Sequence, residues 1–286
     1  MSSRVVIAAD DYALAPGVSR AILELIRRGR ISATGCMTVS PFWKEHAGWL
    51  RPWRYTIDVG LHLTLTDHAP LGPMPLLAPG GRLPSLGALL RASALGQIAM
   101  PEIAVEVQRQ INAFVRHFRH PPAYIDGHQH VHLLPGVRQA VMLALGGLPA
   151  HVWLRDCREP PTAILRRGIA PAKALFIGWL GAGLGQAIDF GRLPANRGFR
   201  GVYDFSGRVP FSELMARFLA PAGRNPARPP LVMVHPGFPD DDLRRLDPIT
   251  DQRQVEYDYL SGDGFVRLLA ERALTISPLT APPAPA

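Results

Sequence analysis

The chain has 286 residues, of which 47% are hydrophobic and 19% charged, a composition typical of a globular protein with a sizeable core. No apolar run reaches the ~18–20 residues needed to cross a bilayer, so we expect no membrane span. The net charge is +8, but no run of basic residues is longer than two, which disfavours a nucleic-acid-binding surface.

Cysteine and lysine are both scarce. Cys36 and Cys157 lie far apart and outside any CxxC motif, which excludes a disulfide framework and a thiolate zinc site. This usage is typical of a reducing compartment, and the apolar run before the first two aspartates has only five residues, unlike a secretory signal. We therefore expect a cytoplasmic protein. Lys44 and Lys173 are the only lysines, which disfavours Schiff-base chemistry.

Short apolar runs alternate with helical patterns along the chain. Residues 4–9 (RVVIAA) are rich in β-branched side chains and end at two aspartates, which is typical of a buried parallel strand. Pro16 and Gly17 then introduce a helix that Gly29 ends. In chain order, the pattern predicts strands at 4–9, 32–39, 56–65, 123–125, 151–154 and 230–234, and helices at 18–28, 102–118, 136–145 and 262–271.

The alternation predicts an α/β fold with a parallel sheet that is either open or closed into a barrel. The close spacing of the strands favours a single domain over residues 1–277. Two Gly/Pro-rich stretches, near 70–100 and 160–207, are expected to be insertions at one rim of the sheet. Within the second, residues 174–185 are expected to form a buried or lid-like segment. The Pro/Ala-rich residues 278–286 are expected to be a flexible tail.

Polar side chains lie at the ends of four predicted strands. Asp10 and Asp11 follow the first strand, and His62 lies within the third. Residues 126–132 (DGHQHVH) follow the fourth, and His235 follows the last. Because the carboxyl ends of parallel strands converge on one rim, where active sites form, we expect these residues to meet.

The residue types in these clusters favour a divalent metal. Imidazole and carboxylate suit Zn²⁺ or other first-row ions, and a catalytic site needs three protein ligands and an open position. Three imidazoles, from His128, His130 and His132, are predicted to share one face of an extended segment. Two adjacent aspartates face opposite ways on a strand unless the strand has ended there, when one can serve as ligand and the other as base.

Several of these features also have a structural interpretation. Asp10 and Asp11 are compatible with a helix-capping role, and His62 with a satisfied interior histidine. Arg155 is either part of a surface pair or a buried arginine that orients the site. Residues 240–242 (DDD) are predicted to be a solvated loop. The absence of a GxSxG motif and of any Gly-Lys pair excludes a nucleophile elbow and a Walker A loop, and no GxGxxG motif supports a dinucleotide site.

Five motifs together resemble the YdjC-like (ChbG/HpnK) carbohydrate deacetylase family. They are ADDYALAPGVSRAI, TGCMTVSP, VGLHLTLT, YIDGHQHVHLLPGV and VMVHPG, and they follow one another over nearly the whole chain. The resemblance implies a (β/α)-barrel-like fold, irregular or partly open and similar to that of polysaccharide deacetylases. It also implies metal-dependent hydrolytic N-deacetylation of an N-acetylglucosamine-containing mono- or oligosaccharide or glycolipid.

The same resemblance implies a role for each residue at a matching position. The divalent ion is expected to be Zn²⁺, with Mg²⁺ or another divalent ion as the alternative. One departure concerns Ala13, because the family usually has Gly-Leu where this chain has Ala13-Leu14, which alters the loop beside the base. The implied metal ligands are Asp11, His62 and His128, the general base is Asp10, the general acid is His235, and Arg155 orients Asp10. His130 and His132 are candidates either for contacts that support the ligands from behind or for substrate contacts.

Three other functions stay open at this point. One is a metallohydrolase of the same fold that cleaves another ester or a phosphoester bond. The second is a non-catalytic sugar-binding protein, and the third is a basic nucleic-acid-binding protein, whose binding would depend steeply on salt. The partner expected from the leading interpretation is an acetylated sugar, and a homodimer is an expectation from the family alone.

Overall fold

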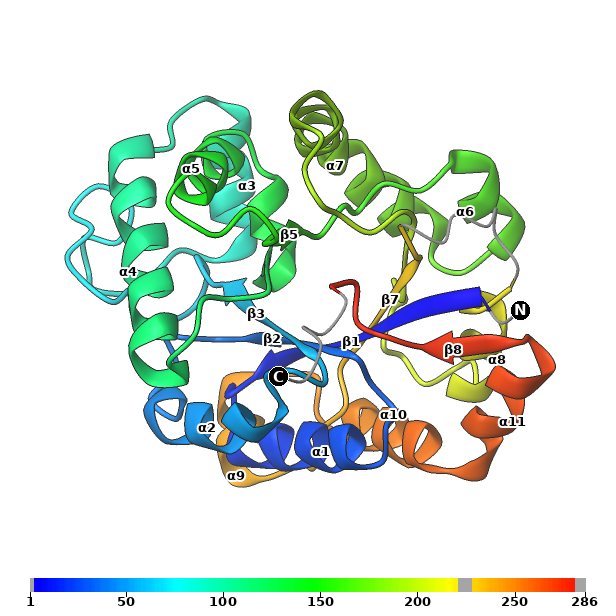
Figure 1. Cartoon of the computed structure of the whole chain (residues 1–286). Helices are drawn as coiled ribbons and strands as arrows, with labels where there is room; N and C mark the ends of the chain where they lie inside the picture. The colour runs from blue at the N-terminus through cyan, green and yellow to red at the C-terminus, as the bar shows by residue number, and fades with distance from the viewer. Residues whose placement is uncertain (1–2, 221–227, 281–286) are drawn as a thin grey trace.

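The computed structural model describes residues 3–220 and 228–280. Within them, eight parallel strands form one sheet, and the helices pack around the outside of this sheet (Figure 1). The strands are β1 Ser3–Tyr12, β2 Ala33–Cys36, β3 Asp58–Leu63, β4 Tyr124–Gly127, β5 Trp153–Leu154, β6 Phe199–Arg200, β7 Leu231–Val234 and β8 Leu274–Ile276. The helices are α1 Pro16–Arg27, α2 Trp43–Leu50, α3 Leu86–Ala94, α4 Met100–Phe118, α5 Val137–Leu145, α6 Pro161–Arg167, α7 Pro171–Gly191, α8 Phe211–Phe218, α9 Asp241–Leu246, α10 Asp251–Ser261 and α11 Asp263–Glu271, with short 3-10 helices η1 Arg51–Trp53 and η2 His128–Leu133.

The sheet has the order β5-β4-β3-β2-β1-β7-β6, with β8 beside β1. Leu154 of β5 makes a parallel bridge with Ala195, shortly before β6, so the two edges of the sheet come together. The strands thus curl into an irregular, partly open barrel, which confirms the expected α/β, barrel-like fold. Helices α3, α4 and α5 lie on one side of it, α6 and α7 on another, and α1, α9 and α10 along a third (Figure 1).

The predicted strands and helices are all present, with ends that differ by at most three residues. The region 160–207 holds three elements that the sequence did not predict, namely α6, α7 and β6. Residues 174–185 are the middle of α7, and the four glycines in this stretch obscure the helical pattern. Two of them have a packing role, because a Cβ at Gly185 would meet Arg158 and one at Gly183 would meet Arg138. Among the described residues, we find no helix with the length and apolarity needed to cross a bilayer.

The prediction of a solvated loop at 240–242 was wrong, because Asp240 caps two helices. Its carboxylate accepts a hydrogen bond from the backbone N–H of Leu243 at 2.8 Å, in the first turn of α9. It also accepts one from the N–H of Gly17 at 2.6 Å, in the first turn of α1. Gly17 has to be glycine, since a Cβ there would lie 2.0 Å from the carbonyl oxygen of Phe238.

The start of the expected tail is held against the barrel. The backbone N–H of Leu279 donates to Asp58 at 2.7 Å, and the hydroxyl of Thr280 also donates to that carboxylate. Arg4 donates to the carbonyl of Pro278. The remaining residues of the tail, 281–286, lie outside the described residues.

An aromatic stack ties β3, β4 and β5 together. The rings of Tyr124 and Trp153 stack with centroids 4.2 Å apart and planes 15° apart. Gly60 of β3 lies beneath Tyr124, and a Cβ there would be 2.4 Å from the ring. Because both rings are fully buried, the stack has no room to move away from β3.

We therefore expect Gly60→Ala to lower the free energy of unfolding by about 1–3 kcal/mol, the usual cost of overpacking a core. Gly48→Ala is the matched control, since Gly48 lies in α2 with open space around it. It should raise the free energy of unfolding by about 0.5–1 kcal/mol through its helix propensity. Urea denaturation measures both, and equal effects would contradict this account of the stack.

Candidate functional site

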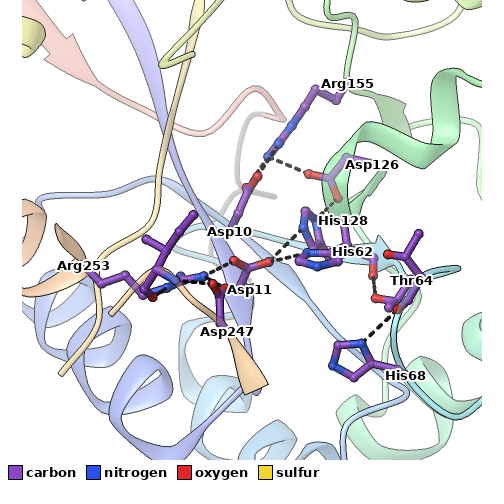
Figure 2. Close-up of polar contacts among 12 residues, drawn as sticks. Asp10, Asp11, His62, Thr64, His68, Asp126, His128, Arg155, Asp247 and Arg253 are labelled. Carbon is purple, nitrogen blue, oxygen red and sulfur yellow. Dashed lines mark hydrogen bonds and ion pairs between the residues drawn. The ribbon is translucent and has the colours of Figure 1, made fainter. Parts of the chain in front are cut away.

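The polar residues picked out along the chain converge at the carboxyl end of the sheet. Asp10 and Asp11 lie near the end of β1, and His62 of β3 is the register partner of Asp126 on the neighbouring β4. His128 follows at the start of η2. Figure 2 shows their side chains pointing toward one another. Parallel pairing thus brings together residues that are more than a hundred positions apart in the sequence.

A bulge turns both aspartates of β1 toward the site. The strand continues to Tyr12, beyond the predicted end, but its register with β2 shifts between Ala9 and Tyr12. Asp11 has φ of 66°, in the left-handed region that aspartate tolerates better than most side chains. The bulge breaks the alternation of the strand. It is this bulge, and not the end of the strand, that allows neighbouring carboxylates to serve one site.

Asp11, His62 and His128 form a group suited to a divalent metal. Asp11 Oδ1 lies 3.3 Å from His62 Nε2 and 2.9 Å from His128 Nδ1. One ligand atom from each residue lies within 4.8 Å of the other two. A carboxylate and two imidazoles are a donor set that Zn²⁺ and other first-row ions accept, so the residues fit such an ion.

A second group, made of Asp10, His62 and Asp126, meets the same distance criterion. It is less suited to a metal because both of its carboxylates already form ion pairs with Arg155. Asp126 Oδ1 lies 2.7 Å from His62 Nδ1. This contact orients the imidazole so that its other nitrogen, Nε2, faces Asp11, as a carboxylate behind a metal-binding histidine does.

Arg155 is fully buried and bridges two carboxylates. Its Nη1 and Nη2 each donate to one oxygen of Asp10 at 2.6 Å. Its Nη2 also lies 2.6 Å from Asp126 Oδ2. Of the two interpretations of Arg155, the buried one is observed, while Asp156 pairs with Arg158 instead. The bidentate contact fixes the orientation of Asp10.

Arg253, from α10, holds the second oxygen of Asp11 and was not predicted from the sequence. Its Nη2 lies 2.7 Å from Asp11 Oδ2 and 2.6 Å from Asp247 Oδ2, and the side chain is 1% exposed. It follows no strand and belongs to no motif, so the sequence offers no signal for it. Asp126 was among the residues expected to meet at this rim, but the sequence assigned it no role. With Oδ2 held by Arg253, Asp11 presents Oδ1 to His62 and His128.

The three histidines of the HxHxH segment do not share a face, so that prediction was wrong. Gln129 and His130 have φ of 52° and 61°, and the segment turns as η2 instead of running extended. His128 faces Asp11, whereas the His130 ring packs edge-on against Phe199. His132 Nε2 lies 3.2 Å from the carbonyl oxygen of Arg155. Burial lowers the pKa of His132 to about 4 and that of His130 well below its usual range.

Burial and neighbouring charges shift the pKa values of His62 and Asp11 in opposite directions. Burial alone would lower the pKa of His62, but the carboxylates of Asp126 and Asp10 raise it to about 10. Burial alone would raise the pKa of Asp11, but Arg253 and His128 hold it well below its usual range. A metal would displace the proton of His62, so its binding is coupled to proton release.

His235 follows β7 and has an unpaired ring nitrogen. Its Nδ1 is buried and has no hydrogen-bond partner among the described residues. Burial lowers the pKa of the ring to about 4, against the opposing effect of Asp11 and Asp10, so the ring is neutral near pH 7. An orphaned polar atom of this kind is typical of a position that meets a ligand.

Glu256 of α10 holds the backbone of His235. Its Oε2 accepts the N–H of His235 at 2.6 Å, and its Oε1 accepts the hydroxyl of Tyr203 at 2.5 Å. Burial raises the pKa of Glu256 to about 7. The carboxyl therefore titrates in a range where the stability of the protein is readily measured.

The family model that matches this chain and the relatives that resemble it agree with one another. The sequence model of the YdjC-like protein family matches residues 4–271. A chitooligosaccharide deacetylase of Serratia marcescens is 28% identical over 279 residues, which cover 96% of this chain and 98% of that protein. A carbohydrate deacetylase of Mus musculus is 28% identical over 258 residues, covering 82% of this chain and 78% of the relative.

Two solved structures share the fold. The crystal structure of a putative cellobiose-phosphate cleavage protein from Enterococcus faecalis V583 superposes with a TM-score of 0.73 at 19% identity, covering 98% of both chains. A peptidoglycan N-acetylglucosamine deacetylase superposes with a TM-score of 0.52 at 10% identity, covering 98% of this chain and 88% of the other. At these identities the likeness establishes the fold alone, and it agrees with the expected similarity to polysaccharide deacetylases.

The raised pKa of Glu256 predicts a specific pH dependence of stability. Between about pH 4.5 and 7 the folded protein keeps a proton on Glu256 that the unfolded chain has lost, so the free energy of unfolding falls as pH rises. Glu256→Gln removes this contribution, and Tyr203 can turn its hydroxyl to accept from the amide. Between pH 5 and 8, the free energy of unfolding of the variant should rise relative to that of the wild type by up to about 3 kcal/mol.

Denaturation at a series of pH values measures this difference. Glu213→Gln is the control, because Glu213 is half exposed and pairs with Arg217 on the surface. Its difference from the wild type should not change with pH over the same range. A constant difference for Glu256→Gln as well would show that Glu256 titrates at its ordinary pKa.

Proposed function

This chain belongs to the YdjC-like protein family, and we propose that it hydrolyses the acetamide of an N-acetylglucosamine-containing sugar with the help of a divalent metal ion. The substrate is a mono- or oligosaccharide or a glycolipid. The observation that carries the proposal is the grouping of Asp11, His62 and His128 beside a second carboxylate, Asp10, that is not part of the group. The names of the relatives, chitooligosaccharide and carbohydrate deacetylases, support the substrate class.

Asp11, His62 and His128 are proposed to hold the ion, with Zn²⁺ as the first choice and Mg²⁺ or another divalent ion as the alternative. An ion held there would supply Lewis acidity toward the acetamide carbonyl and toward the attacking water. The chain itself supplies the orientation of the ligands. Asp126 holds the His62 ring from behind, and Arg253 holds Asp11 so that one oxygen faces the histidines.

Asp10 is proposed to be the general base, which takes a proton from water as the water attacks the carbonyl carbon. Both its oxygens accept from Arg155, and each keeps a lone pair for the proton. We propose that Arg155 acts as a positioning residue for Asp10. Because Arg155 also contacts Asp126, the same guanidinium sets the relative positions of the base and of the carboxylate behind His62.

His235 is proposed to be the general acid, which protonates the departing amine. The unpaired Nδ1 supports this role, since a buried ring nitrogen without a partner is available to a ligand. Its ring is neutral in the free protein because burial lowers its pKa to about 4. The acid role therefore requires the ring to take up a proton in the substrate complex, where negative charge develops on the substrate.

The direct test is the release of amine and acetate from a panel of N-acetylated sugars by metal-stripped protein, with Zn²⁺, Co²⁺, Mn²⁺ or Mg²⁺ added back. We expect the two products in equal amounts, and only with an added ion. His235→Gln should bind the ion as the wild type does and lose about 10²–10⁴-fold in rate. His151→Gln, at an exposed position outside the site, is the matched control and should change neither the binding of the ion nor the rate.

Three results would contradict the proposal at different points. Metal binding without amine release from any sugar would refute the substrate class. Release of product from another ester or a phosphoester, with no amine from the sugars, would identify a metallohydrolase of different specificity. The absence of metal binding would refute the site itself.

A further inference from the structure

Helix α7 exposes large apolar side chains to solvent. Phe176 is 46% exposed, Trp179 70% and Phe190 95%. Their spacing puts all three on one face of the helix, and the rings of Phe176 and Trp179 stack with centroids 6.0 Å apart. Leu165 of the adjoining α6 is 59% exposed. Figure 1 shows α6 and α7 together at the periphery of the barrel.

Packing of α7 on the barrel does not account for this apolar face. Its opposite face already supplies the core contacts, through buried residues such as Ile177, Leu184 and Ile188. Scattered apolar side chains on a surface are ordinary, but three large aromatic side chains exposed on one face of a single helix, two of them stacked, are typical of a contact surface. The sequence therefore keeps aromatic side chains at positions where folding does not require them.

The segment that carries this face is also strongly basic. Residues 158–200 contain two acidic residues. Glu159 is 4% exposed and contacts Arg167, and Asp189 contacts Arg158 at 2.8 Å, so neither offers free negative charge. The same range contains seven basic residues, Arg158, Arg166, Arg167, Lys173, Arg192, Arg197 and Arg200. Three of them, Arg158, Arg167 and Arg200, pair with these two acidic residues, so the segment keeps an excess of positive charge.

Two of these cations lie next to the apolar residues along the chain. Arg166 follows Leu165 in the last turn of α6, and Arg192 lies directly after the end of α7, close to Phe190; both are exposed. The ammonium of Lys173 instead donates to the carbonyl of Tyr203 at 3.1 Å. Exposed aromatic rings bordered by arginine and lysine are the pattern of helices that lie in the headgroup region of a bilayer. Anionic lipid headgroups complement the charge, and acyl chains complement the rings.

We propose that the α6–α7 surface, defined by Leu165, Phe176, Trp179 and Phe190 with the bordering cations, docks onto an anionic lipid bilayer. The helix would lie along the membrane plane without crossing it. A second copy of this chain fits the surface less well. In a two-fold pair the same basic segment would face itself, and like charges across an interface repel.

Docking in this way would place the candidate site close to the bilayer. Helix α7 packs against η2, the segment that begins with His128. The surface is nevertheless separate from the metal group, because none of its apolar residues contributes a ligand atom. Binding to lipid should therefore be the same with and without a divalent ion, so it can be tested whether or not the proposed deacetylation is correct.

The test is co-sedimentation of the full chain with vesicles of phosphatidylcholine alone or with 30% phosphatidylglycerol, in 0.1 M salt. We expect binding to the anionic vesicles and little to the neutral ones. The triple variant Phe176→Ser, Trp179→Ser, Phe190→Ser should lose at least tenfold in partition coefficient. Arg166→Gln and Arg192→Gln should each lose about fivefold, the equivalent of about 1 kcal/mol per cation near an anionic surface.

The control removes large exposed apolar side chains elsewhere. Leu95, Leu143 and Leu246 are 57%, 66% and 45% exposed and lie outside α6 and α7. Their triple replacement by serine should leave vesicle binding unchanged, and circular dichroism establishes that both triple variants fold. An equal loss in the control, equal binding to neutral vesicles, or no binding by the wild type would overturn the proposal. If the wild type is dimeric in light scattering and the α7 variant monomeric, with no vesicle binding, the surface joins two copies instead.

Discussion

Two buried arginines that each bridge two carboxylates hold the site together (Figure 2). Arg155 joins Asp10 to Asp126, and Arg253 joins Asp11 to Asp247. Charges removed from water are stable only when they are paired, and removal of one partner typically costs about 3–5 kcal/mol. Each arginine therefore fixes one of the adjacent aspartates in its own direction. This separation is what allows one carboxylate to pair with two histidines while its neighbour pairs with Arg155.

The backbone of the barrel makes this pairing feasible. A bulge near the end of β1 turns two consecutive side chains into the site, which a regular strand would not do. On the neighbouring strands, glycine leaves room for the imidazole, since a Cβ at Gly35 of β2 would lie 2.9 Å from His62 Nδ1. Parallel register then aligns His62 with Asp126. Strand geometry and small residues, more than loops, determine where the reactive groups lie.

The sequence predicted the elements whose patterns are local, and it missed those that depend on contacts across the fold. Strands such as β7 are continuous apolar runs, and the polar residues at the strand ends predict that these ends meet at one rim of the sheet. Helix α7 has no polar face and several glycines, so its periodicity is hidden. The turn at Gln129, which separates the three histidines, follows from left-handed backbone that no short motif specifies. Arg253 reaches Asp11 from 242 residues away, and only the packing of α10 shows it.

The central claim is that Asp10 and Asp11 are adjacent in sequence but separate in function. Calorimetric titration of Zn²⁺ into metal-stripped Asp10→Asn and Asp11→Asn tests it most directly, beside the wild type and with folding checked by circular dichroism. The account predicts that Asp10→Asn binds the ion within a few-fold of the wild type. It predicts that Asp11→Asn loses about 10²-fold or more in affinity, since a direct ligand is removed. Equal losses in the two variants, or a larger loss in Asp10→Asn, would contradict the account.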